Sequence, residues 1–299
     1  MPQRKLISFD WAMKKLLRSK ANFDILEGFL SELLKNNIHI LEILESESNK
    51  EDKRNKFNRV DLKVRNQENE IIIIEVQYER EFDYLQRILF GTSKVLTEHI
   101  RESDPYSELI KVISINILYF DLGQGEDYIY HGSTSFKGLH KQDILALSEE
   151  QQELYKKDRI YQIFPEYYLI KVNNFNDVAK DTLDEWIYFL KNEEIKEDFK
   201  AKGLKKAKQE LDILKLPDHE RLAYERYQDD LHYQASMVES SYTIGIRKGV
   251  KQGIEQGMIK GEKQKAIEIA KNLIDILDSK TIAIKTGLTE KEIEVLRGK

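Results

Sequence analysis

The sequence predicts an α/β protein in which a central mixed β-sheet is flanked by helices, with an all-α C-terminal extension. Apolar residues recur at helical spacing over 9–17 and 23–34, which predicts two amphipathic helices. Alternating or continuous apolar runs over 58–64, 70–78 and 111–120 are typical of strands. Near the C-terminus, glycines recur at every fourth residue, which sets this part of the chain apart from the sheet domain.

The remaining elements follow from the same patterns. Further helices are expected at 82–100, 148–157 and 181–190, and further strands at 38–44, 128–136 and 159–172. Asp181 or Thr182 is suited to cap the helix at 181–190. Helices interleaved with one sheet form a layered domain, which we expect over residues 1–192. A charged helical connector is expected over 193–240, broken into two pieces at Pro217.

The glycine-repeat segment, residues 241–262, contains Gly245, Gly249, Gly253, Gly257 and Gly261. A glycine inside a helix costs about 1 kcal/mol relative to alanine. Two interpretations therefore stay open, a helix that packs closely on a partner helix in a homo-oligomer and a weakly helical connector.

Residues 263–299 predict a small helical tail with a helix-turn-helix pattern. Gly287 marks the turn, and Thr289 and Glu292 have the spacing of a capping box at the start of the last helix. Such helical pairs pack against protein more often than they read DNA.

Composition limits the class of protein. The chain has 299 residues, no cysteine and a formal net charge of -5, and its apolar runs are too short to cross a membrane. A cytoplasmic protein without disulfides is expected. The acidic total argues against a purely electrostatic DNA binder. Basic residues nevertheless gather in two clusters, one containing Lys14, Lys15 and Arg18 and the other containing Lys56, Arg59 and Lys63.

Residues 57–81 carry the most informative pattern. Folded as an antiparallel hairpin about the polar turn at 66–69, this segment pairs Asp61 with Glu75. Side chains alternate along a strand, so Asp61 and Lys63 share a face with Glu75 and Gln77. The hairpin therefore predicts a cluster of four polar side chains.

Two anions placed across a hairpin repel each other, and their burial is costly without compensation. A divalent cation would resolve this cost, and oxygen ligands of this kind select Mg²⁺ or Mn²⁺. A neighbouring arginine, Arg59, Arg65 or Arg87, would also resolve it. Spacing alone leaves both interpretations open.

Several motifs together resemble a known family. They are Asp10 to Lys14, Val60 to Val64, Ile74 to Gln77, Arg87 with Ser93-Lys94, and the apolar run from Val112 to Phe120. In this combination the chain resembles the recombination-promoting nuclease/transposase family of the PD-(D/E)xK nuclease superfamily. The resemblance implies a restriction-endonuclease-like fold. It also implies a Mg²⁺-dependent DNA endonuclease linked to recombination or mobile elements, with Mn²⁺ as an alternative ion.

The chain departs from the wider superfamily at two site positions. Val60 stands where a proline often precedes the first aspartate, and Gln77 stands where lysine is usual, which removes a cation. Within the motif near the start, Met13 replaces the phenylalanine usual in the family, a conservative packing change.

The resulting hypothesis assigns a role to each residue. Asp61 and Glu75, with the carbonyl of Val76, hold the metal. Gln77 orients the attacking water, and Lys63 or Arg87 supplies positive charge. The residues expected to contact DNA are Lys56, Arg59, Arg87 and Lys94. Asp10 is expected to cap the first helix. The alternative function is a catalytically silent, nuclease-fold protein that binds DNA or forms oligomers.

Overall fold

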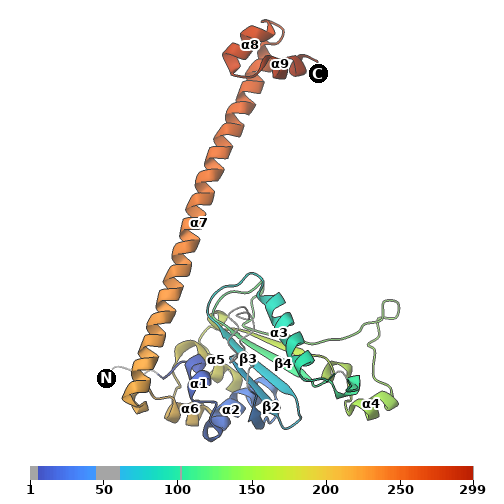
Figure 1. The fold of residues 1–299 in the computed structure, drawn as a ribbon, viewed down its shortest axis with the longest axis vertical. Coiled ribbons are helices and arrows are strands. Elements are labelled where there is room, and N and C mark those ends of the chain that lie inside the picture. Colours follow the sequence, from blue (N-terminus) through green and yellow to red (C-terminus); the bar gives the residue numbers. More distant parts are fainter. Residues whose placement is uncertain (1–5, 45–60, 102, 299) are drawn as a thin grey trace. The chain divides into compact units, whose positions relative to one another are not determined.

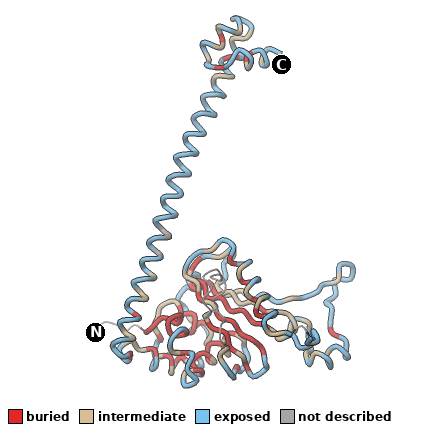
Figure 2. The backbone as a smooth tube through the Cα atoms, viewed as in Figure 1, coloured by how far each residue is buried: buried red, intermediate tan, exposed pale blue. Residues whose placement is uncertain are grey.

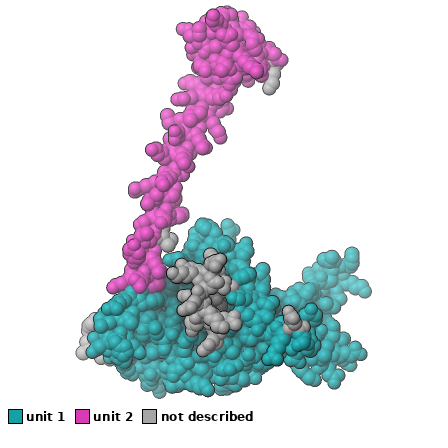
Figure 3. Space-filling view, viewed as in Figure 1, with its two compact units in different colours: residues 1–228 teal, residues 229–299 magenta. Residues whose placement is uncertain are grey.

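The computed structural model describes residues 6–44, 61–101 and 103–298, and it divides into two compact units, Met1–Gln228 and Asp229–Lys299 (Figures 1 and 3). Helix α7 (Asp218–Leu273) begins in the first unit, and its residues from 229 onward belong to the second. No helix in the described ranges is long and apolar enough to cross a membrane.

The first unit is built on a six-stranded mixed sheet. Its strands are β1 (Ile40–Ile43), β2 (Leu62–Asn66), β3 (Ile71–Gln77), β4 (Val112–Leu118), β5 (Ile129–Gly132) and β6 (Glu166–Lys171). Their order in the sheet is β1-β2-β3-β4-β6-β5. The β3, β4 and β6 strands run parallel, while β1, β2 and β5 pair antiparallel with their neighbours. The predicted mixed sheet is confirmed.

Helices cover both faces of this sheet (Figure 1). They are α1 (Phe9–Lys15), α2 (Phe23–Leu34), α3 (Tyr84–Glu98), α5 (Thr182–Asn192) and α6 (Leu204–Glu210). Helix α4 (Glu149–Tyr155) has no buried residue and lies away from the sheet. Short 3₁₀ turns lie at Lys20–Asn22, Tyr106–Glu108, Ile160–Gln162, Val172–Asn174 and Ile213–Lys215. The first part of the range expected as a strand at 159–172 is therefore a turn. Only its second half, β6, joins the sheet.

The central strands are apolar because they are covered on both faces. All seven residues of β4 are buried. On one face, Ile72 and Ile74 of β3 join the main core with residues of α1, α2, α5 and α6. On the other face, Ile71 and Ile73 pack with Val95 of α3. Figure 2 shows this buried layer in red through the centre of the sheet.

The β2–β3 hairpin has the register expected from the sequence. Leu62 pairs with Ile74 and Lys63 pairs with Ile73, so the prediction of this register is confirmed. Asn66 stabilises the turn, since its Oδ1 accepts hydrogen bonds from the backbone N–H groups of Glu68 and Glu70. Asn69 adopts the left-handed conformation that asparagine tolerates. Alternation and turn chemistry together specify this pairing.

Aromatic packing fixes helix α1 against the rest of the first unit. Phe9 packs edge-on against Phe29, with ring centroids 5.4 Å apart, and against Trp186 at 6.1 Å. Trp11 packs edge-on against Tyr224 at 5.4 Å. The Tyr224 hydroxyl also accepts a hydrogen bond of 3.0 Å from the backbone N–H of Ser8. The first turns of α7 therefore hold the start of α1.

The core extends beyond residue 192, where the sequence analysis ends the sheet domain. Apolar residues of the following segment are buried in the same main cluster; these include Ala201, Leu204, Ala207, Leu211 and Tyr224. Pro217 lies between the 3₁₀ turn at Ile213–Lys215 and α7, which begins directly after it. Asp181 caps α5 as predicted, because its side chain accepts a hydrogen bond from the N–H of Asp184.

The second unit contains the rest of α7 with α8 (Ser279–Thr286) and α9 (Glu290–Arg297). The predicted capping box of Thr289 and Glu292 is present at the start of α9, and Gly287 has the positive φ of a helix-ending turn. Ala270, Ile282, Leu288 and Ile293 form a small core in this unit.

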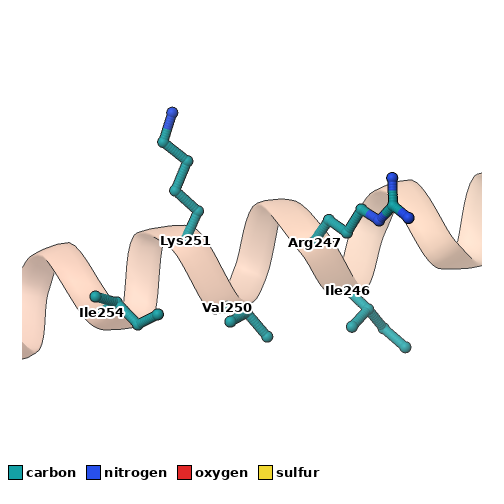
Figure 4. A pocket seen from close by; sticks show the side chains of 5 residues that line it. All are labelled: Ile246, Arg247, Val250, Lys251 and Ile254. Atoms are coloured by element: carbon teal, nitrogen blue, oxygen red, sulfur yellow. The ribbon is translucent and has the colours of Figure 1, made fainter.

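The glycine-repeat segment is helical throughout. Side chains of Ile246, Val250 and Ile254 point to one side of the helix, while Arg247 and Lys251 point to the other (Figure 4). Ile246, Val250 and Ile254 are 48%, 56% and 59% exposed, so the described residues leave this apolar ridge uncovered.

Candidate active site

The site begins where the β2–β3 hairpin ends. Asp61 lies one residue before β2, and its Oδ2 accepts a hydrogen bond of 2.7 Å from the backbone N–H of Val76. Val76 directly follows Glu75, so this hydrogen bond fixes the Asp61 carboxylate beside the strand position of Glu75. The hairpin therefore brings together the two carboxylates that the sequence pairs.

Glu75 faces the start of helix α3 and the neighbouring strand. The Tyr84 hydroxyl lies 3.3 Å from Oε2 of Glu75 and 3.2 Å from Oδ1 of Asn116. Asn116 is the register partner of Glu75 on β4 and is buried. Parallel strands end at one edge of a sheet, where side chains from several strands meet. Tyr84 and Asn116 thus form one wall of the site.

Gln77 belongs to a polar chain that leads to Arg87. Its Nε2 donates a hydrogen bond of 3.0 Å to Oε1 of Glu81 and one of 3.3 Å to the backbone oxygen of Glu79. Arg87 donates to the same Glu81 oxygen at 2.6 Å. Glu81 therefore links Gln77 on β3 to Arg87 on α3.

Electrostatics at the site favour a bound cation. Burial raises the pKa of Glu75, Asp61 raises it further, and Arg87 opposes the shift. Burial also raises the pKa of Asp61, against the lowering effect of Lys14. For both carboxylates, the cost of removing the charge from water exceeds the stabilisation that neighbouring cations and hydrogen-bond donors provide. A cation at this place would restore the balance.

Asp10 lies in this region and does not cap the helix that contains it. Ser8 is the N-cap of α1, because its side chain accepts a hydrogen bond from the N–H of Trp11. The expected capping role of Asp10 is therefore wrong. Asp10 is one turn before Lys14, and its carboxylate pairs with the Lys14 ammonium at 2.8 Å and 3.0 Å.

Lys14 joins Asp10 to the hairpin. Its Nζ lies 3.6 Å from Oδ1 of Asp61. Tyr227 of α7 donates a hydrogen bond to Oδ2 of Asp10. Burial and the Asp10 carboxylate both raise the pKa of Tyr227, so the phenol keeps its proton and acts as a donor. Residues of α1 and α7 thus reach the same carboxylate pair as the hairpin.

The other predicted site residues are placed differently. Lys63 is buried, and its Nζ lies 3.5 Å from Oε2 of Glu98 at the end of α3. Lys94 lies 3.5 Å from the other oxygen of Glu98. These two lysines form an ion-pair cluster with Glu98, and within the described ranges neither forms an ion pair with Asp61 or Glu75. Lys56 and Arg59 lie outside the described residues.

A family model described as a PD-(D/E)XK nuclease family transposase matches residues 7–241. The chain belongs to this family. No curated protein and no solved structure matches the chain. The mixed sheet, the flanking helices and the helical C-terminal region agree with the PD-(D/E)XK fold. The family places the protein among nucleases linked to mobile elements.

The site of this PD-(D/E)XK protein suits a hard divalent cation. The described residues contain no group of three or more histidine, cysteine, aspartate or glutamate side chains that could hold a metal. Asp61 and Glu75 would be the acidic ligands of a bound ion. Mg²⁺ is commonly held by one or two carboxylates and completes its shell with water and substrate phosphate. The oxygen donors and raised pKa values of the two carboxylates fit such an ion.

Sequence reasoning left out several residues of the site. Tyr84 and Glu81 follow the motif closely in the chain, and their polar character was an available signal. The roles of Asp10, Lys14 and Tyr227 depend on contacts between distant segments. Asp10 and Lys14 lie in a segment on which the family resemblance rests, but no spacing in the sequence places them against Asp61.

Proposed function

We propose that this PD-(D/E)XK family protein is a Mg²⁺-dependent DNA endonuclease that hydrolyses phosphodiester bonds. The observation that carries the proposal is the Asp61–Glu75 pair. The Asp61 carboxylate is fixed by the N–H of Val76, and both carboxyl groups have raised pKa values at the end of a covered strand. A catalytically silent binding protein has no need for this costly pair.

Asp61 and Glu75 would hold the ion, with the carbonyl oxygen of Val76 proposed as a third donor. When bound, the metal would polarise a phosphoryl oxygen and activate a water molecule for in-line attack. The Tyr84 hydroxyl would orient the Glu75 carboxylate by donating a hydrogen bond to its Oε2.

Gln77 is proposed to position the attacking water. It does not serve as a base, because its side-chain amide is neutral and does not take up a proton near neutral pH. Its Nε2 is engaged by Glu81, which fixes the orientation of the amide. Its Oε1 accepts no hydrogen bond from the described residues and is available to a water molecule.

Arg87 is the better placed of the two cations first considered for the transition state. It contributes to the electrostatic environment of Glu75, whereas Lys63 is paired with Glu98. Preorganised positive charge near a reacting phosphate stabilises the charge that develops there. Lys94, Lys56 and Arg59 would contact flanking phosphates, which position DNA without reading its sequence.

Purified full-length protein should cut plasmid DNA in Mg²⁺ or Mn²⁺ and should not cut it in EDTA. Asp61→Ala and Glu75→Ala should each abolish cutting and weaken Mg²⁺ binding measured by calorimetry. Glu126→Ala is a matched control, because Glu126 is an exposed acidic residue on a loop. Cutting that survives both site substitutions would overturn the site assignment. A wild-type protein that binds DNA but never cuts it would favour the silent, nuclease-fold alternative.

We also propose that the chain self-associates through the glycine-repeat segment. A Cβ added at any of its five glycines meets nothing within 4 Å among the described atoms, so these backbone surfaces are open. Rows of residues four apart form ridges, and a row of glycines forms a groove of the same inclination. Each of Ile246, Val250 and Ile254 directly follows one of these glycines in the chain, so one copy offers both surfaces that a second copy requires.

A further inference from the structure

The proposed endonuclease site is short of positive charge. Asp61, Glu75 and Glu81 lie around it, and a scissile phosphate would add further negative charge. Gln77 is neutral at the position where the wider superfamily has lysine. Arg87 is already paired with Glu81 at 2.6 Å. A second cation near Asp61 would balance the site.

Lys14 has the position and freedom for this task. Its Nζ lies 3.6 Å from Oδ1 of Asp61, and its side chain is 40% exposed, so Lys14 is both close to the carboxylate and partly accessible to solvent. A lysine has a flexible stem and three donors, which allow it to exchange one anion for another over a short distance. The present partner of Lys14 is Asp10, one helical turn earlier.

Asp10 is an unusual partner because its side chain is only 2% exposed. Its Oδ1 accepts no well-directed hydrogen bond from the described residues, although it lies 2.8 Å from Lys14. Its Oδ2 accepts a hydrogen bond from the Tyr227 hydroxyl. A buried carboxylate that lost its cation would be strongly destabilising without another polar partner. Tyr227 provides that partner.

We propose that Lys14 binds the scissile phosphate and supplies the positive charge that Gln77 lacks, while Tyr227 holds Asp10 when Lys14 moves to the substrate. This inference rests on the proposed endonuclease function. Lys14 would be a catalytic residue because it touches the phosphate. Asp10 and Tyr227 are positioning residues that act through Lys14. The Lys14 ammonium also lies 5.7 Å from the centre of the Tyr227 ring, which keeps the cation in place between substrates.

A charge-matched pair of variants tests the phosphate contact. Lys14→Met removes the ammonium and keeps the length of the side chain. Lys15→Met makes the same charge change at the next residue, which is exposed. The affinity of full-length protein for a duplex oligonucleotide should be measured by fluorescence anisotropy at several salt concentrations in EDTA. Lys14→Met should reduce the slope of log affinity against log salt by about 1, and Lys15→Met should leave it unchanged.

Cleavage provides the second readout. Lys14→Met should lower the cleavage rate at saturating Mg²⁺ by about 100-fold or more, and Lys14→Arg should recover part of the rate. Equal salt slopes and equal rates for the Lys14 and Lys15 variants would overturn the proposal. If the wild type does not cleave, the endonuclease function fails, but the salt slope still decides whether Lys14 contacts phosphate.

Tyr227→Phe tests the positioning role. Without the hydroxyl, the buried Asp10 carboxylate should retain the Lys14 ammonium as its ion-pair partner. We expect kcat to fall by about 10-fold with little change in Mg²⁺ affinity. Asp10→Asn in the same chain should restore the rate, because a neutral amide no longer retains Lys14. Tyr224→Phe is the control for packing of α7 on α1, since its hydroxyl contacts the Ser8 N–H. A similar loss in Tyr224→Phe, or no restoration by Asp10→Asn, would contradict the role of Tyr227.

Discussion

The backbone N–H of Val76 donates a hydrogen bond of 2.7 Å to the Asp61 carboxylate. This single contact joins the residue before β2 to the strand that carries Glu75 and Gln77. It fixes one carboxylate oxygen, while the other lies toward Lys14. Backbone geometry therefore fixes the Asp61 carboxylate next to the strand that carries Glu75.

Neutralising Glu75 should stabilise the metal-free protein. Because the pKa of Glu75 is raised in the folded state, its contribution to stability falls as pH rises from the ordinary pKa to the raised one. Glu75→Gln should therefore raise the free energy of unfolding at neutral pH by about 1 kcal/mol. For the first unit, this gain in free energy corresponds to an increase in Tm of about 2–4 °C in EDTA. Calorimetry checks it, and a lower Tm for the variant would contradict it.

In Mg²⁺, the wild type should become more stable than Glu75→Gln, the reverse of the order expected in EDTA. A ligand that binds only the folded state raises its stability by mass action. The wild type should gain Tm as Mg²⁺ is added, and Glu75→Gln should gain much less. Thermal scans over a range of Mg²⁺ concentrations measure the difference. Equal Mg²⁺-dependent gains in both proteins would show that Glu75 is not a ligand.

Removing the Tyr84 hydroxyl should shift the pH dependence of metal binding. Burial raises the pKa of Glu75, and the nearby hydroxyl opposes that shift. Tyr84→Phe should raise this pKa further. A metal ligand must be deprotonated, so Mg²⁺ binding should then be lost at a higher pH on acidification. Calorimetric titrations between pH 5 and about 8 test this, with the exposed Tyr106→Phe as control.

Glu81 should support cleavage by holding the side chains of Gln77 and Arg87 in place. Glu81→Ala releases the Gln77 amide and the Arg87 guanidinium from a shared oxygen. The cleavage rate should fall by about 10- to 100-fold, as is typical when a supporting partner is lost. Glu79→Ala is the control, because Gln77 contacts only its backbone oxygen. Similar rates for both variants would remove Glu81 from the site.

The apolar ridge of the glycine-repeat segment should control self-association. Ile254→Glu places a charge on the ridge, and Arg247→Glu makes a change on the opposite side of the helix (Figure 4). Light scattering during gel filtration should show an oligomer for the wild type and Arg247→Glu, and a monomer for Ile254→Glu. A wild-type monomer at all concentrations would end the proposal of self-association.

The sequence predicted the hairpin well because two independent signals agree there. Alternation of apolar residues defines the buried face, and the Asn66 turn fixes the register. The position of Glu75 on β3 and that of Asp61 directly before β2 follow from this register. The surroundings of Lys63 were less predictable. Its face of the strand was correct, but only the placement of α3 brings Glu98 to its ammonium.

The remaining site residues could not be predicted because their contacts join segments that are far apart in the chain. Asp10 and Tyr227 are separated by 217 positions, and no local pattern indicates that they meet. The cap of α1 was misassigned because Ser8 and Asp10 are both residue types that cap helices. Helical periodicity correctly indicated the elements, whereas their mutual packing required the folded chain.

The contact between Tyr224 and the start of α1 bears on how this protein can be shortened. A chain cut at residue 192 would lose Leu204, Leu211 and Tyr224 from the main core, as well as the Tyr227 hydroxyl at Asp10. A chain that continues through Gln228 would retain every one of these contacts. The smallest fragment able to preserve the active centre is therefore set by the opening turns of α7, well after the last strand of the sheet.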